Sequence, residues 1–268
     1  MGLPMARHLA AAGFAVWGYD IDGERRTALV RVGGREATSP RAIAEACDVS
    51  LVMVADEAQV HEVVNGSGGV LEGAQRGHVL IIGSTITPAV CARVAESARA
   101  RGIGVLDAPV CKGQRGAEAG TLTVLVGGER TLFERCRPIF EAFGDQVFHV
   151  GERVGAGQVA KLANNLLLWT GVVGVHAALS LARRLGLSSS RLRTALQASS
   201  ADSWALRELD RINLTWPEKD LAQIMATADD AGLTLPLVAQ VRELIRGLTR
   251  EDLRRLCSDA DTPNTDPI

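Results

Sequence analysis

The pattern of this 268-residue chain changes near Gly157, and that change constrains the fold more than any other feature. Before Gly157, short Val-, Leu- and Ile-rich segments alternate with segments of helical periodicity. After Gly157 the strand signals stop. Strands alternating with helices are typical of a doubly wound, mostly parallel sheet. We therefore predict a Rossmann-type α/β domain over residues 1–152 and an all-α domain over 153–257, joined by a long interdomain helix.

The predicted elements are as follows. Strands are expected at residues 14–19, 49–54, 78–82, 105–108, 122–126 and 146–150. Helices of the first domain are expected at 5–12, 40–46, 58–65, 88–101 and in a segment ending at 143. Helices of the second are expected from 157 to about 185 and at 190–199, 221–231, 235–248 and 251–257. The tail 258–268 is rich in Asp, Thr and Pro, which predicts disorder.

Composition and charge exclude several classes of protein. The 29 basic and 31 acidic residues nearly balance, so nothing indicates a nucleic-acid partner or an anionic membrane surface. The five cysteines are scattered without a CxxC motif and the histidines lack metal-ligand spacing, which argues against disulfides and metal sites. The most apolar run, 166–181, is interrupted by polar residues and glycines, and the chain starts in an amphipathic helix pattern. We expect no membrane span, no signal peptide and a cytoplasmic protein.

The segment 155–168 carries the strongest functional signal. In a helix, Lys161, Asn164 and Asn165 share one face, because they lie at i, i+3 and i+4. The surrounding residues are Ala, Val and Leu, so these polar groups are costly to bury without partners. One interpretation is a lysine that extends to solvent beside two amides that bridge neighbouring helices. The other is a functional site.

Two weaker motifs lie in the first domain. Gly2 in the run 1–6, followed by Asp20 after the first strand, has the spacing of the second half of a dinucleotide fingerprint. There a glycine allows close helix–sheet packing, and the acid accepts hydrogen bonds from ribose hydroxyls. An aspartate at that place is also a common turn residue. The segment 84–88 is a strand-to-helix turn whose hydroxyls either cap the helix or contact a ligand.

A glycine-rich segment and a helix start complete the set. Residues 107–122 run from a strand into a predicted loop with three glycines, whose backbone N–H groups can face an anion. The alternative is a plain connecting loop. Lys219 begins a K-D-L sequence at a helix start in the second domain, and the alternative there is an exposed charge pair.

Together these motifs resemble the β-hydroxyacid dehydrogenase family, which includes 3-hydroxyisobutyrate dehydrogenase and tartronate semialdehyde reductase and is related to 6-phosphogluconate dehydrogenase. The resemblance covers nearly the whole chain. The family's catalytic motif, G-x-G-x-x-x-K-x-x-N-N, is matched in order and spacing by Gly155, Gly157, Lys161, Asn164 and Asn165.

The resemblance implies an NAD(P)-dependent oxidoreductase acting on a small anionic β-hydroxyacid or its semialdehyde or keto form. Lys161 would be the general acid/base, with its pKa lowered by the apolar helix. Asn165 would hold the substrate oxygen. The carboxylate would bind at Cys111, Lys112 and Gly113, largely through backbone N–H groups. The implied cofactor-binding residues are Gly2, Asp20 at the adenosine ribose, and Thr85 and Lys219 at the nicotinamide end.

Some features depart from the family pattern. Cys111–Lys112–Gly113 replaces Ser-Gly-Gly, so Lys112 either adds an ammonium for a second anionic group or points into solvent. The segment 204–219 and the C-terminal end are short for the family. The strand that should precede Gly2 is missing, so we expect unpaired strand edges in the sheet and a natural reading frame that continues upstream.

The sequence supports more than one cofactor preference and more than one function. Asp20 favours NAD over NADP, because its carboxylate accepts a hydrogen bond from a free 2′-hydroxyl and repels a 2′-phosphate. Arg25 and Arg26 lie nearby and favour NADP, because an arginine can pair with the 2′-phosphate. The rival functions are an imine reductase, against which Lys161 argues, and a cofactor-free paralogue that serves as a binding or dimerisation module. The long apolar helix predicts a homodimer or homotetramer.

Overall fold

The computed structural model describes residues 1–258, and these form two compact units that divide between Lys161 and Leu162. Helix α9 (Ala156–Arg184) passes from the first unit into the second. The predicted domain boundary after residue 152 lies just before this helix. Except for Ser258, the tail predicted to be disordered lies outside the described residues.

The N-terminal unit contains a six-stranded mixed sheet. Its strands are β3 (Val49–Val52), β4 (Val79–Ile82), β5 (Gly104–Asp107), β6 (Val110–Cys111), β7 (Leu122–Gly127) and β8 (Gly144–Gly151). The pairs β3–β4 and β4–β5 are parallel, β7 is antiparallel to β5 and β6, and β8 is parallel to β7. The predicted parallel core is present, and so are the strands predicted at 122–126 and 146–150 and the helix between them.

A separate two-stranded parallel sheet joins β1 (Trp17–Gly18) to β2 (Arg35–Glu36). The strand predicted at residues 14–19 is therefore only two residues long. Within the described part of the chain, β1 pairs with β2 alone and β3 with β4 alone, so the sheet is interrupted between β1 and β3. The predicted interruption of the sheet is confirmed, and it leaves one edge of β1 and one of β3 unpaired.

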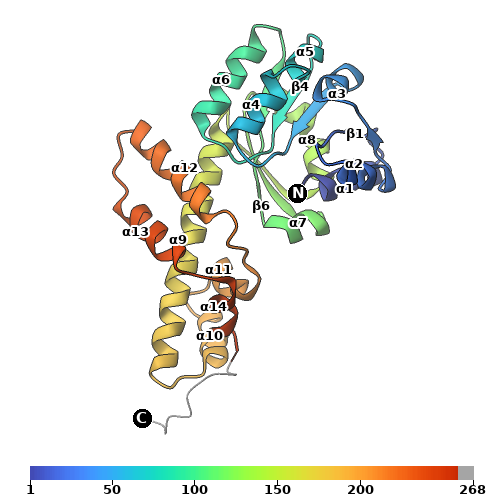
Figure 1. Cartoon of the computed structure of the whole chain (residues 1–268). Coiled ribbons are helices and arrows are strands. Elements are labelled where there is room, and N and C mark those ends of the chain that lie inside the picture. The colour runs from blue at the N-terminus through green and yellow to red at the C-terminus, as the bar shows by residue number, and fades with distance from the viewer. Residues whose placement is uncertain (259–268) are drawn as a thin grey trace. The chain divides into compact units, whose positions relative to one another are not determined.

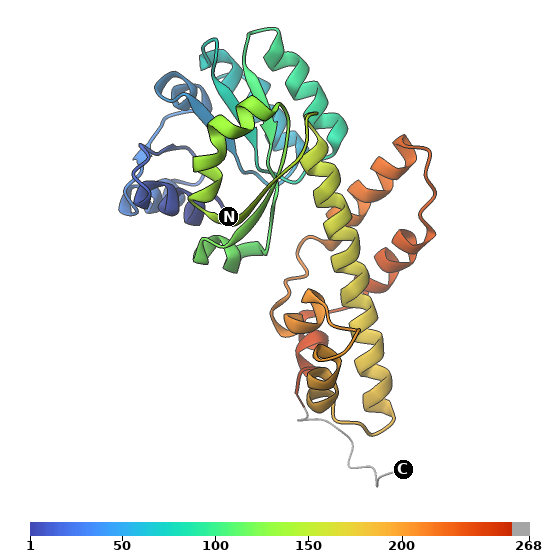
Figure 2. The ribbon, with the colours of Figure 1, turned by 180° about the vertical axis from the view of Figure 1, so that it is seen from behind.

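Strand β4 shows why the sheet is covered on both faces. All four of its side chains are fully buried, as in the central strands of doubly wound sheets. Leu80 and Ile82 pack with α3 to α6 on one face, whereas Val79 and Ile81 pack with α1, α7 and α8 on the other. Figures 1 and 2 show these helices on opposite sides of the sheet.

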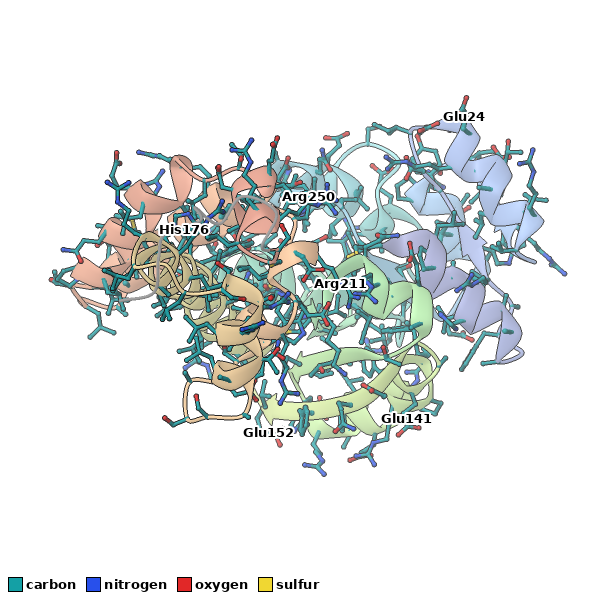
Figure 3. The ribbon with its side chains drawn as sticks, turned by 90° about the horizontal axis from the view of Figure 1, so that it is seen from below. Glu24, Glu141, Glu152, His176, Arg211 and Arg250 are labelled. Carbon is teal, nitrogen blue, oxygen red and sulfur yellow. The ribbon has the colours of Figure 1, made fainter. Side chains whose placement is uncertain are left out.

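The helices of the N-terminal unit largely follow the predicted periodicity. They are α1 (Gly2–Ala11), α2 (Gly23–Arg31), α3 (Pro40–Ala46), α4 (Glu57–Asn65), α5 (Val70–Gly73), α6 (Pro88–Arg99), α7 (Gly113–Ala119) and α8 (Arg130–Glu141). The Asp56 carboxylate caps α4 by accepting from Gln59 N, as a helix-entry residue should. Glu152, labelled on the outside of this unit in Figure 3, accepts a hydrogen bond from Arg130 N at the start of α8.

The predicted loop after Gly113 is wrong, because residues 113–119 form α7. Glycine and short polar residues give this segment little intrinsic helix propensity. Left-handed residues bound the helix, Lys112 with φ 77° and Gly120 with φ 70°. Gly116 and Ala117 are buried within the unit, so packing stabilises a turn that the sequence alone does not favour. The predictions also omitted α2 and α5.

The C-terminal unit is all-α, as predicted. It contains most of α9, followed by α10 (Ser189–Gln197), α11 (Trp204–Arg207), the 3-10 turn η1 (Leu209–Arg211), α12 (Pro217–Asp230), α13 (Pro236–Arg246) and α14 (Arg250–Arg255). Trp169, Val172 and Leu179 of α9 pack in one core with side chains of the later helices. Apolar packing therefore holds this unit around its longest helix.

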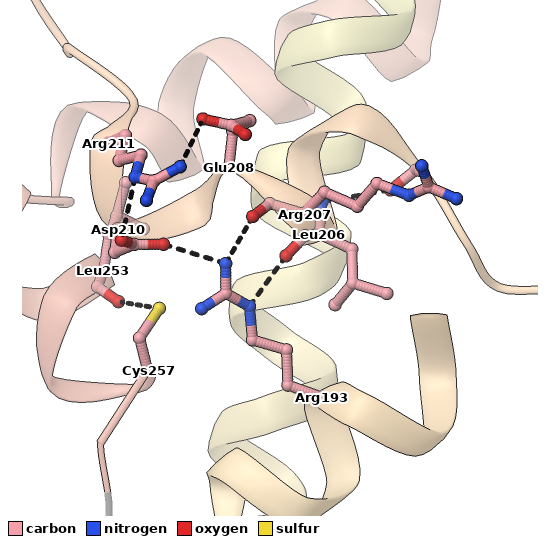
Figure 4. Close-up of polar contacts among 9 residues, drawn as sticks. Arg193, Leu206, Arg207, Glu208, Asp210, Arg211, Leu253 and Cys257 are labelled. Carbon is pink, nitrogen blue, oxygen red and sulfur yellow. Dashed lines mark hydrogen bonds and ion pairs between the residues drawn. The ribbon is translucent and has the colours of Figure 1, made fainter. Parts of the chain in front are cut away.

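A guanidinium fixes α10 to the helices that follow it (Figure 4). Arg193 donates to the backbone oxygens of Leu206 and Arg207 at 2.8 and 2.6 Å, and to the Asp210 carboxylate at 2.8 Å. The last carbonyls of a helix lack partners within it, so this side chain caps the end of α11. The contact orders a region of short helices that offers little apolar surface.

Helix α9 corrects one sequence expectation. At 29 residues it is long and apolar enough to cross a membrane by length and composition alone, although the interrupted run 166–181 led to the expectation of no membrane span. The same composition suits the core helix of the C-terminal unit. One side of α9 enters that core, while Leu167 and Leu181 are 74% and 63% exposed within the described chain.

Candidate functional site

The carboxyl ends of β3, β4 and β5 meet at one edge of the sheet, because these strands are parallel neighbours. Ser84 follows β4 and is buried there. Its Oγ accepts a hydrogen bond from Val54 N at 2.7 Å, just beyond the end of β3. Open α/β sheets bind their ligands at this edge. The serine therefore connects two loops that border the expected ligand site.

Asp107, the last residue of β5, anchors the start of α9. Its fully buried carboxylate accepts hydrogen bonds from Gly155 N and Gln158 N, both at 2.7 Å. Burial raises the pKa of this carboxyl, and the N–H donors of Gly155, Gln158 and Gly157 oppose the rise. The first N–H groups of a helix lack internal acceptors, so the carboxylate caps α9 from the neighbouring strand.

The two glycines of the catalytic motif are explained by this junction. Gly155 has φ +99°, which favours glycine. At Gly157 an added Cβ would lie 2.4 Å from Leu125 O and 2.8 Å from Asp107 Oδ2. The start of α9 therefore packs directly on the strands with no room for a side chain.

Gln158 connects α9 to the loop between β4 and α6. Its side chain is fully buried. The amide oxygen accepts from Ile86 N at 3.1 Å, and the amide nitrogen donates to Ser84 O at 2.9 Å. These two bonds lie on either side of Thr85, a predicted cofactor contact. Thr85 itself is half-buried.

Lys161 lies one helical turn after Gln158. Its Nζ is 3.8 Å from the Sγ of Cys111, at the end of β6, and both side chains are half-buried. The structure thus brings together the predicted acid/base and one predicted substrate-binding residue. An ammonium at this position can donate a proton to an oxygen beside the Cys111 segment.

Lys112 has the single positive φ among the described non-glycine residues. Its ammonium forms an ion pair with Asp145 at 2.8 Å, and the two side chains are 35% and 44% exposed. The charge is therefore partly neutralised by the protein itself. Gly113 begins α7, whose first backbone N–H groups have no acceptor within the helix.

Asp20 and Gly2, the other two predicted cofactor residues of the N-terminal unit, lie at β1 and α1. Asp20 follows β1, and its carboxylate accepts from Asp22 N at 3.0 Å and lies 3.5 Å from Arg25 Nη1. Arg26 is held by Glu36 at 2.7 Å. Gly2 begins α1, where an added Cβ would make only an ordinary 4.0 Å contact with Met53. The close packing expected of this glycine is therefore absent.

The C-terminal unit contributes two of the predicted residues. Asn165 is buried, and its Oδ1 accepts a hydrogen bond from Asn164 Nδ2 at 3.1 Å. Lys219 lies in the first turn of α12, with its Nζ 5.4 Å from the centre of the Trp216 ring. The next residue, Asp220, is buried and accepts from Trp169 Nε1 at 3.1 Å, so it is not half of an exposed charge pair.

The positioning groups Asp107, Gln158, Trp169 and Asp220 had no predicted role in the sequence. A signal existed for some of them, because Gln158 lies inside the catalytic motif and Asp107 begins the glycine-rich segment. Two cavities of about 350 and 440 Å³ occur elsewhere, one along α9 and α14 and one along α4 and α6. Neither is lined by a predicted site residue.

Comparisons with known proteins identify the family. Residues 1–151 match the model for the NAD binding domain of 6-phosphogluconate dehydrogenase. Residues 155–260 match the model for the NAD-binding region of NADP-dependent 3-hydroxyisobutyrate dehydrogenase. The chain belongs to the β-hydroxyacid dehydrogenase family, and it is an NAD(P)-dependent oxidoreductase of that class.

Individual relatives agree with this assignment. The chain is 35% identical to a 3-hydroxyisobutyrate dehydrogenase of Pseudomonas aeruginosa, over 91% of this chain and 87% of that protein. It is 30% identical to a 2-(hydroxymethyl)glutarate dehydrogenase of Eubacterium barkeri, over 94% and 89%.

Solved structures share the fold. A Mycobacterium tuberculosis 3-hydroxyisobutyrate dehydrogenase determined with L-serine superposes with a TM-score of 0.82 at 28% identity, covering 99% of this chain and 92% of that one. An imine reductase of Streptomyces aurantiacus has a TM-score of 0.65 at 20% identity, covering 95% of each chain, and shows the fold alone.

Proposed function

We propose that this protein transfers hydride reversibly between NAD and a small acid whose hydroxyl lies near its carboxylate, with Lys161 as the general acid/base. One observation carries the proposal. The Lys161 ammonium lies beside Cys111 at the carboxyl edge of the sheet, on a helix whose start is fixed by Asp107. The proposed acid/base and one predicted substrate-binding residue thus lie side by side where such sheets bind ligands.

The chain's groups fit a nicotinamide dinucleotide. Asp20 provides a carboxylate for ribose hydroxyls at the end of β1, and α1 starts without a side-chain cap, which leaves its N–H groups suited to a phosphate. Gly2 would belong to that helix start, and Thr85 would contact the nicotinamide end. The bound cofactor supplies or accepts the hydride.

The remaining steps belong to the protein. Lys161 donates a proton to the carbonyl oxygen during reduction and removes it from the hydroxyl during oxidation, a role that typically contributes about 10²–10⁴-fold. Asn165 holds the same oxygen through its amide. The segment from Cys111 to Gly113 receives the carboxylate through backbone N–H groups, and so aligns the carbon that exchanges hydride.

We propose NAD rather than NADP as the preferred cofactor. The Asp20 carboxylate favours a free 2′-hydroxyl, and Arg26 is already paired with Glu36. The exposed Arg25 is the group that opposes this preference. Comparing kcat/KM with the two cofactors, before and after Asp20→Ala and Arg25→Ala, checks the proposal. A wild-type preference for NADP would overturn it.

For the substrate, we propose that the carboxylate is bound by the backbone and not by the Lys112 ammonium. Asp145 already neutralises part of that charge, so a second anionic group gains little there. Lys112→Gly should therefore change activity on mono- and dianionic hydroxyacids equally. A selective loss on dianionic acids would restore Lys112 as a specificity residue.

The test of the function is a panel of small hydroxyacids assayed with NAD and with NADP at the nicotinamide absorbance. We expect reduction of cofactor with at least one 3-hydroxyacid, and its loss in Lys161→Ala. The interruption between β1 and β3 favours one other candidate, a cofactor-free module. Fluorescence titration with NADH separates the two, because such a module would not bind it.

The exposed side of α9 favours assembly of the chain into a homodimer or a homotetramer. Leu167, Gly174 and Leu181 recur every seven residues, a spacing that suits side-by-side helices. An added Cβ at Gly174 would meet nothing within 4 Å, so this side is open. Leu167→Glu should lower the mass measured by light scattering, and an unchanged mass would place any interface elsewhere.

A further inference from the structure

We propose that Gln158 is a positioning residue that sets the placement of Thr85 relative to Lys161, and thereby aligns hydride transfer with proton transfer. The proposal rests on the proposed function, in which Thr85 contacts the nicotinamide end and Lys161 moves the proton. All three residues belong to the N-terminal unit. Gln158 itself touches neither reacting group in this scheme.

The bonding pattern of Gln158 requires an amide. Its oxygen accepts from Ile86 N and its nitrogen donates to Ser84 O, so one planar group binds the residues before and after Thr85. A carboxylate can accept a hydrogen bond but cannot donate one. A thioether has no donor and is only a weak acceptor. The side chain is fully buried, so water cannot replace either bond.

The other end of this connection is equally fixed. The backbone N–H of Gln158 donates to Asp107, which also caps the helix at Gly155. Lys161 follows three residues later on the same helix, so its backbone is rigidly related to that of Gln158. The Gln158 side chain therefore connects the backbone on either side of Thr85 to the helix that carries Lys161, and its amide oxygen and nitrogen both form hydrogen bonds.

The expected effect follows from the demands of hydride transfer. The reacting atoms must be held at near-attack distances, and a misplacement of about 1 Å can cost about 10²-fold in rate. If the Thr85 loop shifts while Lys161 stays, binding of the hydroxyacid is preserved and the chemical step slows. A loss of structural support alone would instead reduce the amount of folded enzyme.

The experiment compares Gln158→Met and Gln158→Glu with the wild-type protein. Both variants keep the length of the side chain. Gln75→Met and Gln75→Glu are matched controls, because that exposed amide forms one bond among the described residues, to Gly73 O at 3.4 Å within the same unit. Active sites are counted by NADH titration, and kcat, KM for the hydroxyacid and the primary deuterium isotope effect are measured per site.

We expect kcat per site to fall by about 10- to 100-fold in both Gln158 variants with KM for the hydroxyacid unchanged. The isotope effect on kcat should rise, since hydride transfer becomes slower than the other steps. Amide hydrogen exchange at Ile86, which needs no activity, should become faster in Gln158→Met. The Gln75 variants should match the wild type in all four measurements.

The outcomes separate the two proposals. If the wild type is active and the Gln158 variants keep kcat per site and the isotope effect, the positioning role is wrong and the proposed function stands. If the wild type transfers no hydride to or from any hydroxyacid, the proposed function fails and the positioning role fails with it. Unchanged exchange at Ile86 would contradict the hydrogen-bonded connection itself.

Discussion

The two units hold their candidate site residues in different ways. In the N-terminal unit Thr85 lies on a loop at the sheet edge and Lys161 lies near the start of α9, and the buried polar groups of Asp107 and Gln158 fix both segments. In the C-terminal unit they stand on helices, which are fixed mainly by apolar packing and by the buried bond from Trp169 to Asp220.

The difference follows from where the backbone N–H and C=O groups of each unit find their hydrogen-bond partners. Loops beyond strand ends carry N–H and C=O groups that need partners once they are buried, so polar side chains must be built into that edge. A helix satisfies most of its own backbone groups, so packing alone can place its side chains. Changes in the first unit should therefore act through hydrogen bonds, and changes in the second through packing.

The largest effect is expected from Lys161→Ala. Turnover should fall by about two to four orders of magnitude, because the proton donor is lost, while cofactor affinity changes little. Steady-state rates and NADH titration measure the two quantities. Arg130→Ala is the control, since that guanidinium forms an exposed ion pair with Glu134 away from the candidate site. Retention of more than a tenth of wild-type turnover would remove Lys161 from the mechanism.

The next largest effect is expected from Asp107→Asn, which should lower the free energy of unfolding. The amide offers one acceptor oxygen where the carboxylate offers two, so a buried N–H of Gly155 or Gln158 loses its partner at a cost of about 3 kcal/mol. Denaturant unfolding followed by the fluorescence of Trp17, which lies in the same unit, measures it. A decrease in the free energy of unfolding below about 0.5 kcal/mol, as for an ordinary surface substitution, would contradict this prediction.

The pH dependence of this cost has a defined sign. Burial raises the pKa of Asp107 above its unfolded value, so its contribution to stability is fully present below the unfolded pKa and is lost as pH rises through the folded pKa. Asparagine does not titrate. The difference between wild type and Asp107→Asn should therefore be larger at acidic pH than at pH 7.

In the C-terminal unit, Trp169→Phe should cost about 1.5 kcal/mol, because the ring keeps most of its packing while Asp220 loses the indole donor. Asp220 keeps a further interaction, which limits the loss. Trp204→Phe is the control, since Trp204 is exposed. A cost equal to that of Asp107→Asn would show that buried polar bonds matter as much in the helical unit.

The smallest effect is expected at Glu218, which pairs with Arg242 and Arg246 on the surface of α12 and α13. The hydrogen bonds from these two guanidiniums lower its pKa from 4.5 to about 2. Solvent screens this exposed group, so Glu218→Gln should cost less than about 1 kcal/mol at pH 7.

That cost should shrink as pH falls from 4.5 towards 2, the opposite sign to Asp107, because a lowered pKa gives stability that is lost in acid. Urea unfolding at several pH values checks it, with Glu243→Gln as the exposed control. A cost that grows in acid would contradict the assigned ion pairs.

The sequence by itself determined the features that depend on local periodicity and on ordered motifs. The apolar run of β4, the cap at Asp56, the long helix α9 and the place of Lys161 within it all follow from residues close together in the chain. The motif spacing also indicated the family, which the matches to the two family models confirmed.

Only the tertiary structure decided which distant groups meet. The bonds of Gln158 to Ser84 and Ile86, of Asp107 to Gly155 and of Lys112 to Asp145 join residues far apart in sequence, and no local period encodes them. Helix α7 likewise depends on packing that its glycine-rich sequence does not reveal. Local patterns fix which side of an element is buried, whereas partners across a sheet edge are set by the packing of strands and helices that fold together.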